Sequence, residues 1–255
     1  MRDINEMFWN ASVEEIKNGY VYEEETDEFV CLICGKTFIK GIIYQEKGML
    51  LEAERAVKDH ISCEHKSTFD YLLSMDKRLT GLTDVQKGLL DLFYQGLSDS
   101  EIVKKVDAGS TSTIRNHRFA LRQKEKQAKV FLAIMELLKE RKPDRREDFV
   151  DMHKSATMVD ERYAITEEEN EKILTAYFKE GPDGPLSDFP TKEKRKIAVL
   201  RNIVKRFEVG KQYTEKEVNE ILKKVYDDFV LLRRYLIEYG FLDRHNDGSA
   251  YWVKI

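Results

Sequence analysis

Two neighbouring stretches determine the fold expected of this chain, LTDVQKGLLDLFYQGLSDSEI at residues 82–102 and STSTIRNHR at residues 110–118. In the first stretch, Thr83 is placed to cap one helix and Ser98 to cap a second, with apolar residues at helical spacing between them. Ser110 is placed to cap a third helix whose polar side is rich in arginine. Two short helices followed by a capped basic helix are typical of a helix-turn-helix.

These stretches resemble the LuxR-type (GerE-type) helix-turn-helix family of bacterial transcription factors. The matching residues are Leu-Thr at 82–83, Gly-Leu-Ser-x-x-Glu-Ile at 96–102 and Ser-x-x-Thr-Ile-Arg-x-His at 110–117. The resemblance implies that a recognition helix over about 110–122 lies in the major groove of double-stranded DNA. The residues expected to contact bases or phosphates are Ser112, Arg115, Asn116 and Arg118, and Arg122 projects from the same polar side. The turn at 107–109 departs from the family pattern, and no glycine follows the recognition helix.

The charge distribution agrees with a nucleic-acid partner. The net charge is −4, but residues 1–30 carry nine acidic side chains against two basic ones, and residues 104–129 carry eight basic side chains against two acidic ones. A basic block inside an acidic protein is typical of a local site for a polyanion. The sequence therefore predicts a sequence-specific DNA-binding transcriptional regulator.

Two classes of function compete with DNA binding. The alternative is a protein-interaction module that acts on RNA polymerase or a sigma factor without direct DNA readout. A zinc-dependent enzyme is disfavoured because the chain has no nucleophile elbow, no His-Glu-x-x-His motif and no glycine-rich phosphate loop. We therefore expect no enzymatic activity.

A second motif, FVCLICGKTF at residues 29–38, places Cys31 and Cys34 in a Cys-x2-Cys turn. The expected second ligand pair is His60 and His65. The pattern resembles a two-Cys two-His zinc finger with a long insertion, and implies a structural Zn²⁺ ion. Cys63 shares a helical face with His60 and is the alternative to His65 as fourth ligand. Cysteines packed as small apolar side chains, without metal, are the other alternative.

The 255 residues and 30.0 kDa correspond to roughly two or three domains. We expect a mainly α-helical protein with small β elements, built from a β-hairpin and helix zinc-finger-like unit, a helix-turn-helix bundle with a long helix, and a winged-helix-like domain. The expected domain ranges are 1–75, 76–140, a linker at 141–165, and 166–255. The last range resembles a small domain of unknown function found at the C-terminus of bacterial regulators. Whether it binds DNA or serves as a dimerisation or effector module stays open.

Apolar residues continue along the third helix at heptad positions, including Ala128, Phe131, Met135 and Leu138. This seam either packs within the chain or forms a homodimer, and we expect the homodimer because one groove contact is weak and helix-turn-helix modules commonly act in pairs. No stretch approaches the roughly 18 apolar residues of a membrane-spanning helix. Residues 1–9 include acidic side chains, where a secretory signal would be basic and then apolar. We therefore expect a soluble cytoplasmic protein without a membrane partner, and the sequence identifies no small-molecule effector.

Overall fold

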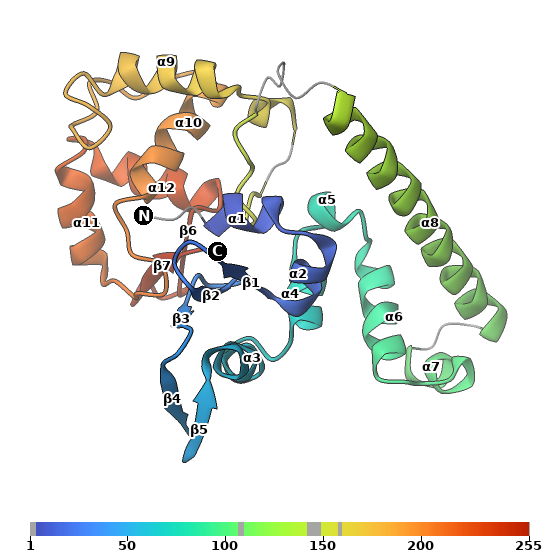
Figure 1. Cartoon of the computed structure of the whole chain (residues 1–255). Helices are drawn as coiled ribbons and strands as arrows, with labels where there is room; N and C mark the ends of the chain where they lie inside the picture. Colours follow the sequence, from blue (N-terminus) through green and yellow to red (C-terminus); the bar gives the residue numbers. More distant parts are fainter. Residues whose placement is uncertain (1–3, 107–109, 142–148, 158–159, 255) are drawn as a thin grey trace. The chain divides into compact units, whose positions relative to one another are not determined.

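The chain folds into two compact units. The computed structural model describes residues 4–106, 110–141, 149–157 and 160–254. The first unit joins Met1–Leu79 to Asp148–Ile255, and the second is Thr80–Glu147. Helices predominate and the sheets are small and antiparallel, as predicted (Figure 1). No helix among these residues is long and apolar enough to cross a membrane. The turn at 107–109 and residues 142–148 of the expected linker lie outside the described residues.

The N-terminal part of the first unit is a small sheet covered by helix α3. Its elements are α1 (Ile4–Asn10), α2 (Val13–Asn18), β1 (Tyr20–Glu23), β2 (Glu28–Cys31), β3 (Thr37–Ile39), β4 (Ile43–Glu46), β5 (Met49–Glu52), α3 (Ala53–Glu64), α4 (Thr68–Ser74) and α5 (Lys77–Thr80). Strands β1, β2 and β3 form one sheet, and β4 with β5 forms a separate hairpin. Helix α3 buries Ala56, Val57 and Ile61 in a core that includes Phe38 of β3. The hairpin is therefore the long insertion expected between the two ligand pairs.

The second unit is the predicted arrangement of three helices. They are α6 (Asp84–Tyr94), α7 (Asp99–Val106) and α8 (Thr111–Arg141). Thr83 and Gln86 form a reciprocal capping box at the start of α6. The core joins Leu89 and Leu92 of α6 to Ile102 of α7 and Ile114 of α8. Helix α8 continues without a break for 31 residues, so the recognition segment and the apolar seam lie on one helix.

The C-terminal part of the first unit has the helix order and terminal hairpin expected of a winged helix. Its elements are a 3-10 turn (Glu161–Tyr163), α9 (Glu167–Tyr177), α10 (Glu193–Val204), α11 (Glu215–Lys223), α12 (Phe229–Glu238), β6 (Leu242–Arg244) and β7 (Tyr251–Val253). Thr214 and Glu217 form the expected capping box on α11. Tyr213 pairs with Tyr251 through both backbone hydrogen bonds, at 2.8 Å each. This pairing ties the start of α11 to the hairpin.

The N-terminal and C-terminal parts are joined by the segment 150–157, which we call the strap. Trp9 Nε1 donates a hydrogen bond to Met152 O at 2.6 Å, on the N-terminal side. Ser155 Oγ donates to Gly240 O at 2.8 Å, on the C-terminal side. The sequence predicts a linker at 141–165, whereas the strap within that range is packed between the two parts, with Ala156 only 1% exposed. The difference arises because contacts far apart in sequence leave no mark on local composition.

We predict that Gly240→Ala lowers the free energy of unfolding by about 2–4 kcal/mol, because a Cβ combines left-handed strain with a clash. Gly240 has φ +80, and a Cβ there would lie 2.3 Å from Ser155 O. The matched control is Gly210→Ala, which has φ +79 but no atom within 4 Å of its Cβ. The control should lose about 1 kcal/mol from strain alone. Urea denaturation measures both values, and equal losses would contradict close packing of the strap.

Candidate metal centre and basic helix

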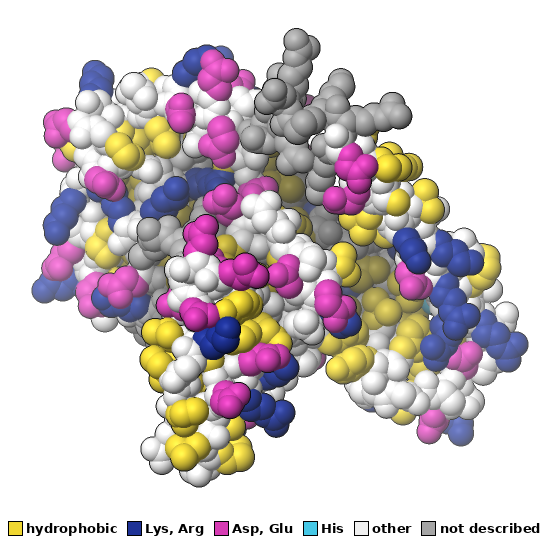
Figure 2. Space-filling view, in the orientation of Figure 1, with side chains coloured by type: hydrophobic (Ala, Val, Ile, Leu, Met, Phe, Trp, Pro, Cys, Tyr) yellow, Lys and Arg dark blue, Asp and Glu magenta, His cyan; other side chains and the backbone are white. Residues whose placement is uncertain are grey.

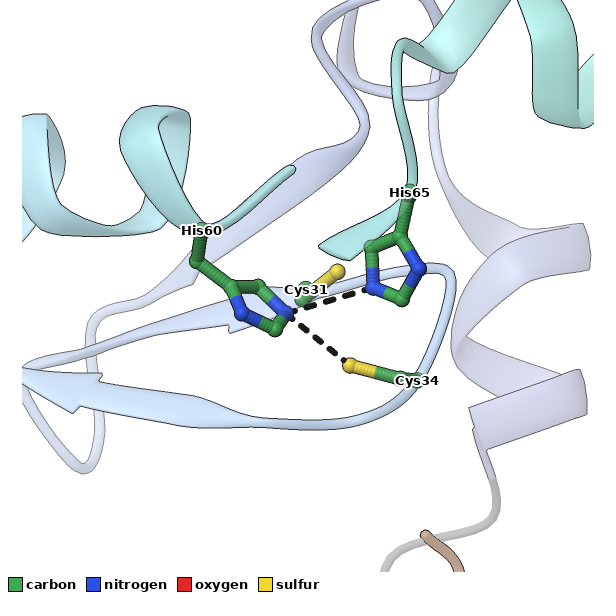
Figure 3. A group of neighbouring side chains, drawn as sticks. All are labelled: Cys31, Cys34, His60 and His65. Carbon is green, nitrogen blue, oxygen red and sulfur yellow. Dashed lines mark hydrogen bonds between the residues drawn. The ribbon is translucent and has the colours of Figure 1, made fainter. Parts of the chain in front are cut away.

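Four potential metal ligands converge beside one end of α3, and we call them the Cys/His cluster (Figure 3). Cys31 ends β2, and Cys34 lies in the turn before β3. This turn is closed by a hydrogen bond from Gly35 N to Cys31 O at 2.8 Å, and Gly35 supplies the left-handed φ of +79. His60 lies in the second half of α3, and His65 follows the helix end. The predicted ligand set is thus brought together.

The ligand atoms of the Cys/His cluster are close enough to share one ion. All four lie within 4.8 Å of one another. Cys34 Sγ is 3.1 Å from His60 Nε2, which is 3.2 Å from His65 Nε2 (Figure 3). In a tetrahedral site with metal–nitrogen distances of about 2.0–2.1 Å and metal–sulfur distances of about 2.3 Å, neighbouring ligands lie roughly 3.3–3.8 Å apart. Small adjustments would therefore place all four ligands around a metal ion.

The pKa values of the two thiols of the Cys/His cluster are shifted in opposite directions. A hydrogen bond with Cys34, together with burial, raises the pKa of Cys31, which is fully buried. The hydrogen bond from Cys31 is the largest influence that lowers the pKa of Cys34, and His60 and His65 lower it further. Cys34 is thus the thiolate that is ready to bind a cation. A bound metal would favour the thiolate form of Cys31 as well, because ligation displaces the thiol proton.

Cys63 lies outside the Cys/His cluster. Its thiol is exposed, and it accepts a hydrogen bond from Lys47 Nζ at 2.8 Å. Cys63 Sγ also lies 3.5 Å from Asp59 Oδ2. The chain bends after α3 and brings His65 back to His60 instead. Of the two fourth ligands that the sequence left open, the structure brings His65 into the cluster.

Lys154 is a residue of the site that the sequence analysis missed. It belongs to the strap and is 3% exposed. Its Nζ donates hydrogen bonds to Leu32 O at 2.7 Å and to Ile33 O at 3.3 Å, inside the Cys-x2-Cys turn. More than a hundred residues separate donor and acceptors along the chain, so no spacing rule connects them.

Four of the five residues predicted to contact DNA are exposed on the first half of α8. They are Ser112, Arg115, Asn116 and Arg122. The Arg115 side chain is 73% exposed and lies 4.0 Å from Asp99. Figure 2 shows lysine and arginine side chains gathered over this part of α8. These residues therefore form a continuous polar and basic surface.

Arg118, the fifth predicted residue, is engaged inside the second unit. Its Nε donates a hydrogen bond to Asp99 Oδ1 of α7 at 2.9 Å. Its guanidinium lies over the Phe93 ring of α6, 3.7 Å from the ring centroid. Arg118 thus connects all three helices, and its Nε is engaged by the Asp99 carboxylate. The spacing that placed it on the polar side of α8 could not reveal this contact.

Residues 185–253 match a family described as an uncharacterized protein conserved in bacteria (DUF2087). The match includes α10, α11, α12 and the terminal hairpin, and it agrees with the resemblance of this part to a bacterial domain of unknown function. Neither the curated proteins nor the solved structures compared with the chain gave a match. The matched residues do not include 82–118, so the LuxR-type resemblance stays a prediction.

Proposed function

We propose that this chain is a cytoplasmic, sequence-specific DNA-binding transcriptional regulator that places the first half of α8 in the major groove. The main support is the exposed polar and basic surface of α8 on a helix whose opposite side is fixed by a core. Ile114, on that opposite side, is 1% exposed against Leu89 and Ile102. An α-helix of about 10–12 Å diameter matches a major groove about 12 Å wide.

Each exposed residue of this surface suits a particular contact. Arg115 can bind guanine through two parallel hydrogen bonds, and Asn116 can do the same with adenine. Arg122 is about two turns further along α8, where a phosphate contact is the more natural role. Arg118 is assigned a positioning role, because it holds α8 against Asp99 and Phe93.

We also propose that the ion of the Cys/His cluster is Zn²⁺. Two thiolates and two imidazoles in a four-coordinate arrangement are typical of structural zinc sites. The cluster joins the β2–β3 turn to the end of α3, so an ion would hold together elements that share a small core. Zinc would thereby stabilise the N-terminal part of the first unit.

The second half of α8 supports a homodimer. Residues 130–138, which we call the apolar end of α8, include seven large exposed apolar side chains. Each has an area of roughly 150–200 Å² and is about half exposed, so the apolar surface is on the order of 600 Å². A stable interface takes about 800 Å² from each partner, which a second copy of α8 and its neighbourhood can supply. The alternative function, binding to RNA polymerase or a sigma factor, would use the same apolar end.

Arg115→Ala should weaken specific DNA binding by about 1–3 kcal/mol without unfolding the second unit, because the side chain is exposed and reads a base edge. Arg115→Lys is the matched control: it keeps the charge but loses the paired hydrogen bonds, so only affinity for nonspecific DNA should be retained. Fluorescence anisotropy with selected and random duplexes measures both. Unchanged specific affinity in Arg115→Ala would refute the groove assignment, and absence of any salt-dependent DNA binding would favour the protein-interaction alternative.

Elemental analysis should find one zinc per chain in protein purified without chelator. Cys34→Ser should lose that zinc, whereas Cys63→Ser should keep it, because only Cys34 belongs to the Cys/His cluster. The variant without zinc should be loosened over residues 20–65, with faster amide exchange but with its helices retained, while α6 to α8 stay unchanged, since the two units have separate cores. Loss of zinc in Cys63→Ser, or its retention in Cys34→Ser, would contradict the assigned ligand set.

Phe131→Asp should shift the protein from dimer to monomer in sedimentation experiments. The dimer dissociation constant should rise about 100-fold or more, because a buried aromatic contact worth about 2–3 kcal/mol is replaced by a charge. Val85→Asp is the matched control, since Val85 is 62% exposed, Phe131 is 61% exposed, and Val85 lies outside the apolar end of α8. A monomeric wild type, or dissociation of both variants alike, would rule out this interface.

A further inference from the structure

The Cys/His cluster is open to solvent on one side. Cys34, His60 and His65 line a cavity of about 930 Å³, whereas Cys31 is fully buried behind them. The cavity is also lined by three carboxylates, Glu28, Glu64 and Glu208, and by the Lys36 ammonium. A cation can therefore approach three of its four ligands through a cavity whose acidic side chains outnumber the basic one, which favours entry of positive ions.

The wall of this cavity opposite the zinc-finger-like part comes from the C-terminal part. Glu208, Val209 and Gly210 lie in the loop between α10 and α11. The same loop is connected to the hairpin, because Tyr213 pairs with Tyr251. The metal site thus lies where the two parts of the first unit meet.

The strap gives a second and more direct connection. Lys154 Nζ donates to Leu32 O and Ile33 O, the carbonyls between the two cysteine ligands. The orientation of these carbonyls depends on how the Cys-x2-Cys turn is held. An ion bound by Cys31 and Cys34 fixes that turn, so it also fixes the acceptors of Lys154.

The residues on either side of Lys154 bind the C-terminal hairpin region. His153 stacks on Phe241 with 4.0 Å between ring centroids, and His153 Nε2 lies 2.9 Å from Tyr239 O. Ser155 Oγ lies 2.8 Å from both Gly240 O and Lys254 O, so its single hydroxyl proton is shared between these two carbonyls. The strap turns at residues 153–156, where Ala156 N donates to His153 O at 3.0 Å. Its adjacent residues therefore contact the Cys-x2-Cys turn and the end of the winged-helix-like part.

We propose that the Cys/His cluster is an exchangeable metal site whose occupancy is transmitted through the strap to the C-terminal hairpin, so that the metal acts as a signal to the winged-helix-like part. This inference rests on the proposed metal site. It adds that the ion enters and leaves the folded protein, and that residues 238–254 respond to it. Because coupling between two sites is reciprocal, a weakened strap must also weaken metal binding.

Hydrogen exchange of the full chain with and without Zn²⁺ tests the coupling. In the wild type, removal of zinc by a chelator should speed amide exchange in residues 238–254 by about 5–150-fold, the usual range for coupling between two sites. Residues 84–94 of the second unit are the internal reference and should not change. Zinc release should occur while the far-ultraviolet circular dichroism of the helices is retained.

Two strap variants and one control sharpen the test. Lys154→Met removes the link to the Cys-x2-Cys turn, and the milder Ser155→Ala removes the hydroxyl link to the hairpin. Both should reduce the zinc-dependent change in residues 238–254 and raise the zinc dissociation constant. Ser187→Ala is the control, because it also loses a hydroxyl bond to a backbone carbonyl, at 3.0 Å from Tyr177 O, but lies outside the strap. It should behave as the wild type.

The outcomes separate this inference from the proposal of a zinc site. If no zinc binds, the proposed zinc site and the proposed coupling are both wrong. If zinc binds but residues 238–254 exchange at the same rate with and without it, only the coupling is overturned. Release of zinc only on global unfolding would overturn exchangeability, and an unchanged response in both strap variants would overturn the assigned route.

Discussion

The interaction on which the first unit depends is the convergence of two thiols and two imidazoles within 4.8 Å. Polar groups this close must share protons or a cation, because a buried polar group without a partner costs free energy. Without an ion, the Cys31 thiol and the two imidazoles surround the Cys34 sulfur and lower the pKa of Cys34. With an ion, both thiolates are compensated at once. The turn between the cysteines is therefore held by whatever occupies the cluster, and the strap is attached to that turn.

Much of this fold could be predicted from the sequence, because the residues that determine it are close together along the chain. Capping pairs such as Thr83 with Gln86 and Thr214 with Glu217 fix helix starts over three residues. The geometry of the Cys-x2-Cys turn is likewise determined by residues that are close together along the chain. What could not be predicted is that Met1–Leu79 and Asp148–Ile255 form one unit. That association depends on contacts between distant segments, and polar residues at 150–157 look like a linker in composition alone.

In the candidate sites, too, features that depend on nearby residues could be predicted, whereas contacts between distant residues could not. Helical spacing correctly placed Arg115, Asn116 and Arg122 on an exposed face of α8. It could not distinguish Arg118, since spacing says which side of a helix a residue is on and nothing about the neighbouring helix. Asp99 sits in the first turn of α7, where acidic residues are ordinary, so its pairing with Arg118 carried no sequence signal. Lys154 was missed for the same reason.

The length of α8 connects the two activities proposed for it. About 19 residues separate Arg115 from the middle of the apolar end, which at about 1.5 Å per residue is roughly 28 Å. Two copies that meet at their apolar ends and diverge can thus place their recognition segments up to about 57 Å apart, and the spacing of about 34–36 Å between successive DNA turns lies within this range. Because α8 is one unbroken helix, the angle at which two copies cross would set the distance between half-sites. Dimer geometry would then be part of DNA specificity.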